Sequence, residues 1–156
     1  QVPMRAVALA MNEPVGVIGA LCPDEAPLLG FVSVMAPAIA MGNTCVLVPS
    51  QSAPLSATDF YQVLETSDLP AGVVNIVTGA HHDLAKPLAG HLDVDAVWSF
   101  SSAPLSAQIE TEAAGNLKRT WVNYGRGRDW FGATGAGREF LRHATEIKTI
   151  WVPYGE

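Results

Sequence analysis

The stretch that decides the fold is "VGVIGALCP", residues 15–23, a run of apolar residues that ends at a cysteine and a proline. Because this run is apolar on both of the faces that a strand would present, it predicts a buried strand of a parallel sheet. Similar runs follow along the chain, each bounded by turn residues. They predict further strands at residues 44–48, 73–77, 96–100 and 120–122.

Helical periodicity fills the segments between these predicted strands. Apolar residues recur at steps of three and four between Leu28 and Ile39, which predicts a helix ended by Gly42 and Asn43. Ser56 followed by Asp59 resembles a capping box for a second helix. The same reasoning predicts helices at residues 84–89 and 105–113. Strands that alternate with helices indicate an α/β fold, here a doubly wound, Rossmann-like parallel sheet.

The two ends of the chain have a different pattern. Residues 4–11 and 146–152 resemble strands with no helix beside them, so we expect them to pair as a small antiparallel β arm outside the main sheet. The predicted organisation is therefore a Rossmann-like domain over residues 12–132, with residues 1–11 and 133–156 forming the arm.

Composition excludes several classes of function. The chain of 156 residues has a net charge of −6 and no cluster of Lys and Arg, which argues against binding nucleic acid. Its longest apolar stretch, residues 27–41, is too short and too interrupted by proline to span a membrane. With 49% hydrophobic and 15% charged residues, part of the surface is expected to meet another subunit.

The two cysteines, Cys22 and Cys45, lie in apolar runs without metal-ligand or redox-pair spacing, which predicts buried free thiols in a reducing compartment. No signal-peptide pattern is present and the chain begins with Gln1, so we expect a piece of a longer, cytoplasmic protein.

A doubly wound sheet places ligands at the carboxyl ends of its strands. No Gly-x-Gly-x-x-Gly or P-loop opens any predicted helix. Three polar pairs follow the strands, and each has two interpretations. Asp24-Glu25 is an acid/base pair or two solvated carboxylates. His81-His82 is a metal site or a pair of solvated loop histidines, and Ser101-Ser102 is an anion site or a helix N-cap.

Three longer strings are specific in combination. They are "EPVGVIG" (13–19), "APAIAMGNT" (36–44) and "LPAGVVNIVTG" (69–79). Together they resemble the coenzyme-binding domain of the aldehyde dehydrogenase superfamily, and in particular the truncated second unit of the tandem aldehyde dehydrogenase 16 family. Residues 137–149 resemble the closing segment of that family, which forms its oligomerisation arm.

The resemblance implies that the catalytic groups are missing. Members of the family use a cysteine nucleophile, an Asn that stabilises the oxyanion, and a Glu base. Glu25 falls at the place of the Asn and Asn123 at the place of the Glu. The nucleophile belongs to a catalytic domain that is absent here, and "VNYGRGRDWFG" (122–132) resembles the splice, near residues 123–132, where this domain has been left out.

The resemblance also implies that the coenzyme contacts have been lost. Val48 and Gln51 replace a Lys and a Glu that hold the adenosine ribose. His81 and Ala85 replace glycines that flank the adenine helix, so they add bulk there.

The turn that receives the pyrophosphate has changed as well. Ser101 replaces its first glycine, and the family's Gly-Ser-Thr-x-x-Gly turn spans residues Ser101, Ser102 and Ser106 in this sequence. We therefore expect neither NAD nor a metal to be bound.

These residues predict a non-catalytic structural module, a pseudoenzyme that docks through its arm on a neighbouring aldehyde dehydrogenase unit in the same chain, on a second protomer, or on other proteins. Two alternatives stay open. One is a regulatory domain that binds a dinucleotide or an anion near Ser101 and Ser102, and the other is a part of an NAD-dependent aldehyde oxidoreductase.

Overall fold

The computed structural model describes residues 5–154; the parts of the predicted arm at residues 1–4 and 155–156 lie outside the described residues. A five-stranded parallel sheet in the order β4-β3-β2-β5-β6 forms the body, as predicted. Its strands are β2 (Val17–Leu21), β3 (Thr44–Val48), β4 (Val74–Ile76), β5 (Ala96–Ser99) and β6 (Arg119–Val122).

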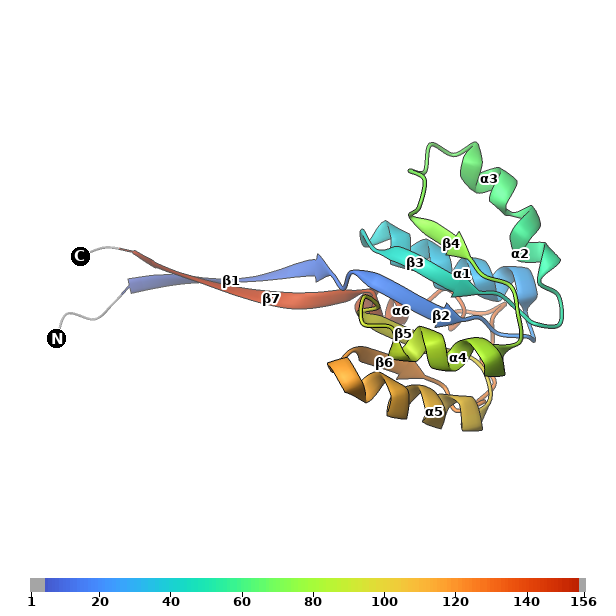
Figure 1. Cartoon of the computed structure of the whole chain (residues 1–156). Helices are drawn as coiled ribbons and strands as arrows, with labels where there is room; N and C mark the ends of the chain where they lie inside the picture. Colours follow the sequence, from blue (N-terminus) through green and yellow to red (C-terminus); the bar gives the residue numbers. More distant parts are fainter. Residues whose placement is uncertain (1–4, 155–156) are drawn as a thin grey trace.

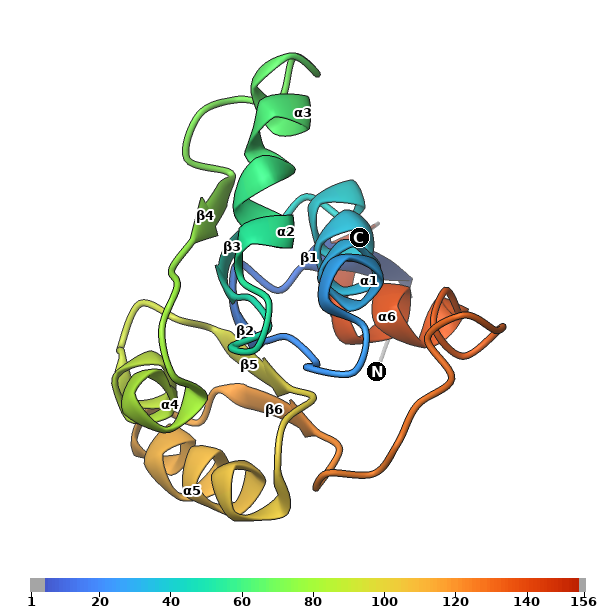
Figure 2. The same cartoon turned by 90° about the vertical axis from the view of Figure 1, so that its right-hand side faces the viewer.

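Helices cover both faces of this sheet (Figures 1 and 2). One face carries α1 (Pro27–Ala40) and α6 (Arg138–His143), and the other carries α4 (His81–Gly90) and α5 (Ala103–Ala113). The short α2 (Leu55–Asp59) and α3 (Tyr61–Glu65) connect β3 to β4, and the 3₁₀ turn η1 (Ala114–Asn116) precedes β6. This arrangement confirms the doubly wound α/β fold.

The two ends of the described chain form the second sheet. β1 (Arg5–Pro14) and β7 (Thr145–Tyr154) pair antiparallel over their whole length, from Arg5 opposite Tyr154 to Pro14 opposite Thr145. Both strands are longer than the predicted 4–11 and 146–152. Figure 1 shows this arm projecting away from the body.

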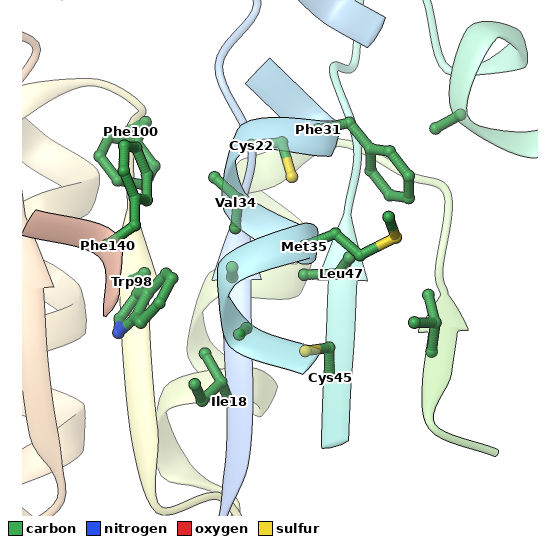
Figure 3. Packing of buried hydrophobic residues seen from close by; sticks show 14 of the residues in the cluster. Ile18, Cys22, Phe31, Val34, Met35, Cys45, Leu47, Trp98, Phe100 and Phe140 are labelled. Carbon is green, nitrogen blue, oxygen red and sulfur yellow. The ribbon is translucent and has the colours of Figure 1, made fainter. Parts of the chain in front are cut away.

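The core has two parts because alternate residues of each parallel strand point to opposite faces. The larger part lies under α1 and α6 (Figure 3), and includes Ile18, Leu47, Trp98 and the helix residues Phe31 and Phe140. The smaller part lies under α4 and α5, where Leu21, Val48, Val97, Leu88 and Ile109 meet. The parallel strands are therefore covered on both faces, as their continuous apolar sequence indicates.

Both cysteines are buried free thiols, as predicted. Burial raises the pKa of Cys45 to about 12, and burial together with the neighbouring Cys45 raises the pKa of Cys22 well above its ordinary value. Neither thiol is therefore an activated nucleophile.

Two details of the sequence prediction are wrong. Ser56 does not cap a helix: α2 already begins at Leu55, and the Ser56 hydroxyl donates to the Ala53 carbonyl. α4 begins at His81 instead of residue 84, so the histidine pair lies at the start of a helix.

Across residues 5–154, no helix is both long and apolar enough to cross a membrane.

Candidate functional site at the carboxyl edge of the sheet

The carboxyl ends of β2, β3, β5 and β6 meet at one edge of the sheet, where they surround a cavity of about 280 Å³. This is the edge at which doubly wound folds hold ligands. The fold brings together most of the predicted site residues here. The cavity is lined by Asp24, Glu25, Gln51, Phe100, Ser101, Ser102, Leu105, Asn123, Gly125 and Arg126.

Asp24 is the centre of a hydrogen-bond network at this edge. Its Oδ1 accepts from the Ser50 hydroxyl and the Gln51 amide at 2.8 Å each and from the Ser52 amide at 3.3 Å, while Oδ2 accepts from Gln51 Nε2 at 2.9 Å. Partial burial pushes the pKa of Asp24 upward, but the hydrogen bonds from Gln51, Ser50 and Ser52 outweigh it and lower the pKa. The carboxylate thus ties the end of β2 to the loop after β3.

Gln51 extends this network to the next element. Its Oε1 accepts from the backbone amide of His81 at 3.1 Å, so a side chain of the protein satisfies one of the unpaired donors at the start of α4. Gln51 therefore bridges Asp24 and α4 with both ends of its amide.

His81 is buried, at 1% exposure, and this corrects the interpretation of the histidine pair as solvated loop residues. Its Nε2 donates to the Pro49 carbonyl at 2.9 Å and its Nδ1 lies 3.1 Å from the Ser101 hydroxyl. Only His82 is exposed, as expected. The sequence could not distinguish the two histidines, because the burial of His81 depends on Pro49 and Ser101 from the loops that follow β3 and β5.

Val48 and Ala85 lie in the core beneath α4, with exposures of 2% and 0%. Val48 also borders a second, apolar cavity of about 420 Å³ on the α4 face, which is lined mainly by valines and leucines. Neither position offers a polar group to a ligand.

The serines at the start of α5 serve the backbone. Ser102 occupies the N-cap position, but its hydroxyl makes no capping bond, so the N-cap interpretation holds for position only. Ser106 is fully buried; its hydroxyl donates to the Ser102 carbonyl and accepts from the Tyr124 amide at 3.2 Å. Gly125 has φ +70°, and a Cβ on it would lie 3.3 Å from the Ala103 amide nitrogen.

Glu25 is not a merely solvated carboxylate, which corrects the interpretation of the Asp24-Glu25 pair. Its Oε1 accepts from the Trp130 indole Nε1 at 2.8 Å. Trp130 itself is 3% exposed. Asn123 lies nearby at the end of β6, where its side chain donates to the Arg126 carbonyl and accepts from the Gly125 amide within its own turn.

The segment after β6, residues 123–137, folds back over the sheet, and we call it the strap. Its Arg128 guanidinium lies 5.0–5.8 Å from the ring centres of Phe100, Trp121, Trp130 and Phe140, and forms an ion pair with Glu139 at 2.7 Å. Sequence reasoning missed this cage, because its rings come from the loop after β5, from β6, from α6 and from the strap itself.

Among residues 5–154, no group of three or more His, Cys, Asp or Glu side chains is placed to hold a metal ion. The polar groups described above are paired with one another, and no buried side-chain nitrogen or oxygen in this part of the chain lacks a partner. These contacts position backbone and side chains, and the Ser101 hydroxyl beside the buried His81 Nδ1, at 3.1 Å, belongs to the same network.

Comparisons with known proteins find relatives of this chain among the aldehyde dehydrogenases. The model of the aldehyde dehydrogenase family matches residues 1–130. The NADP/NAD-dependent aldehyde dehydrogenase PuuC of Escherichia coli (strain K12) is 38% identical over 120 residues, which are 76% of this chain and 24% of the relative. The chloroplastic betaine aldehyde dehydrogenase of Beta vulgaris is 38% identical over 115 residues, 74% of this chain and 23% of the relative.

Solved structures agree with these relatives. Indole-3-acetaldehyde dehydrogenase in its apo form matches with a TM-score of 0.74 and 37% identity over 78% of this chain and 29% of that chain. PnpE from Pseudomonas sp. WBC-3 matches with a TM-score of 0.72 and 33% identity over 75% of this chain and 24% of that chain. The chain spans about a quarter of the length of the curated relatives. On its sequence and its fold, the chain belongs to the aldehyde dehydrogenase family.

Proposed function

We propose that this chain is a non-catalytic structural module of the aldehyde dehydrogenase family, which associates through its β1–β7 arm with a second protomer or with a neighbouring aldehyde dehydrogenase unit in a longer chain. The observation that carries the proposal is the arm itself, a ribbon of two strands with exposed apolar side chains that projects from the body (Figure 1).

One face of the arm is suited to association. Val7, Leu9 and Met11 alternate along β1 and are 44–46% exposed, and the strand register sets Val7 opposite Val152 and Leu9 opposite Ile150. A two-stranded ribbon alone in water is marginally stable, and contiguous exposed apolar side chains mark interaction sites. A partner that covers this face would stabilise the ribbon.

The carboxyl edge supports the non-catalytic part of the proposal. Asp24, Gln51 and His81 are hydrogen-bonded to one another and to the backbone, and Val48 is buried in the core. These contacts occupy the Asp24 carboxylate, both ends of the Gln51 amide and both ring nitrogens of His81. Loss of NAD binding and of the catalytic residues, a cytoplasmic location and the finer assignment to family 16 remain predictions.

An alternative is a regulatory site for an anion or a dinucleotide. The cavity at the carboxyl edge contains Ser101, Ser102 and Arg126 beside the N-terminus of α5, a position that favours negative charge. A second alternative is that the chain is a part of an NAD-dependent aldehyde oxidoreductase, since its relatives are named as dehydrogenases and the match covers about a quarter of their length.

Thermal melting with and without NAD, beside the mass in solution, tests the proposal. A ligand at a hundred times its dissociation constant would stabilise the chain by about 2.7 kcal/mol, a shift of several degrees in melting temperature. We expect no shift with NAD and a mass above that of one chain. A clear shift would instead support the regulatory alternative.

Leu9→Lys, with Leu92→Lys as its matched control, tests the role of the arm. Leu9 lies on the arm face and Leu92, which is 74% exposed, lies on a loop of the body. We expect Leu9→Lys to lower the mass to that of a monomer and Leu92→Lys to leave it unchanged. A chain that is monomeric before substitution would contradict pairing with a second protomer.

A further inference from the structure

The arm is attached to the body through two short connections that lie side by side. Val15 and Gly16 connect β1 to β2, and Ala144 connects α6 to β7. The Val15 amide donates to the Ala144 carbonyl at 3.4 Å, so the two connections touch. Without further contacts, the ribbon would be free to pivot about these residues.

Asn43, in the turn between α1 and β3, binds both connections at once. Its Oδ1 accepts from the Gly16 amide at 2.9 Å, and its Nδ2 donates to the Ala144 carbonyl at 2.9 Å and to the Ala38 carbonyl at 2.9 Å. The side chain is buried, at 2% exposure, so these bonds are shielded from competing water.

The path of the first connection is fixed by Gly16. Its φ of +125° is a conformation that residues with a side chain rarely adopt, and a Cβ on it would lie 2.1 Å from Asp95 Oδ2. Asp95 in turn accepts from the Val17 amide at 2.8 Å. The close approach of Asp95 holds the start of β2 in one position.

The second connection is held from the other side. The Arg119 guanidinium, on β6, donates to the Thr145 carbonyl at 2.7 Å, one residue beyond Ala144. Asn43 and Arg119 therefore bind adjacent carbonyls of the chain where α6 becomes β7, Asn43 from the turn before β3 and Arg119 from the edge strand β6.

We propose that Asn43, assisted by Arg119, is a positioning residue that sets the direction of the β1–β7 arm relative to the parallel sheet. The two connections alone fix where the arm starts, whereas these bonds fix where it points. The consequence for association rests on the proposed function: an arm held in one direction presents its apolar face to a partner in a single geometry, with less orientational entropy to lose on binding.

Distance measurements between two spin labels test this proposal in the full chain. One label is placed on the arm at Thr149→Cys and the other on α5 at Ala107→Cys, both of which are exposed positions. Cys22 and Cys45 are buried and do not compete for label. Labelled protein is diluted into an excess of unlabelled protein, so that only distances within one chain are recorded.

The variants are Asn43→Ala and Arg119→Ala, each with a matched control. Asn75→Ala removes an amide that bonds within the sheet edge, away from the arm, and Arg142→Ala removes an exposed charge from α6 close to the junction. We expect the single narrow distance peak of the parent chain to be lost in Asn43→Ala and broadened in Arg119→Ala, and kept in both controls.

A merely structural role for Asn43 would lower the melting temperature and leave the peak narrow. Such a result, or equal peak widths in Arg119→Ala and Arg142→Ala, would overturn the proposal, and the exposed Arg119 keeps the test decisive if Asn43→Ala does not fold. Mass in solution is measured on the same samples. If the distance peak broadens in Asn43→Ala but the parent chain has the mass of a monomer, the result would support the positioning role and contradict the proposed function.

Discussion

Replacing Trp130 by Ala tests whether the strap is a packed part of the fold or a loose connection. Trp130 is 3% exposed and packs edge-on against Phe100, with ring centres 5.2 Å apart. It also contacts the Arg128 guanidinium, 5.8 Å from its ring centre, and donates its indole N–H to Glu25.

The expected cost follows from this burial. Truncating a buried aromatic side chain to Ala lowers the free energy of unfolding by about 3–5 kcal/mol, because apolar contacts are lost and a cavity remains. Trp130→Phe keeps an aromatic ring in the core but removes the hydrogen bond to a carboxylate and part of the ring volume. We expect the lost hydrogen bond to cost about 1.5 kcal/mol, at the low end for such bonds because water can reach the exposed Glu25, and the lost ring volume to add to this cost.

The next residue supplies the control. Phe131 is 86% exposed, so Phe131→Ala should change the free energy of unfolding by no more than about 0.5 kcal/mol. Urea unfolding of the three variants, followed by circular dichroism, gives each value from the midpoint and the slope. Equal costs for Trp130→Ala and Phe131→Ala would refute a packed strap.

Three further predictions concern buried or charged groups. His81→Ala should lower the free energy of unfolding by about 1–3 kcal/mol, because it leaves the Pro49 carbonyl buried and unpaired. His82→Ala should have almost no effect. Urea unfolding of both variants measures the two costs, and equal costs would contradict this prediction. The pKa of Asp24 is lower in the folded chain than in the unfolded chain, so its contribution to stability is present above about pH 4 and is lost as the pH falls through the folded pKa. Asp24→Asn should therefore make the free energy of unfolding fall less steeply as the pH is lowered. An unchanged acid part of the stability–pH profile would show that other carboxylates control it. Cys22 and Cys45 should not react with a thiol reagent at pH 8 in the native chain and should react fully in denaturant, because burial raises both pKa values; rapid native labelling would show that the core opens.

The sequence by itself determined the sheet, the main helices and the family. Runs such as "VGVIGAL" (15–21) and "TCVLV" (44–48) are apolar on both faces, and between predicted helices they indicate a parallel sheet that is covered on both sides. The unaccompanied strands at the two ends were sufficient to predict an antiparallel arm, which the pairing of β1 and β7 confirms. These features depend on local patterns of hydrophobicity, so they can be predicted from the sequence alone.

Only the tertiary structure decided what the individual side chains do. His81 and His82 are identical in type and adjacent in sequence, yet one is buried between two strand ends and the other is exposed. Arg128 lies in the stretch that resembles a splice, where the sequence predicts no contact for it, but rings from distant elements surround it. Hydrogen bonds and aromatic contacts of this kind join residues that are far apart in the chain. Which residues meet depends on how the helices and strands pack, and hydrophobic periodicity does not encode that packing.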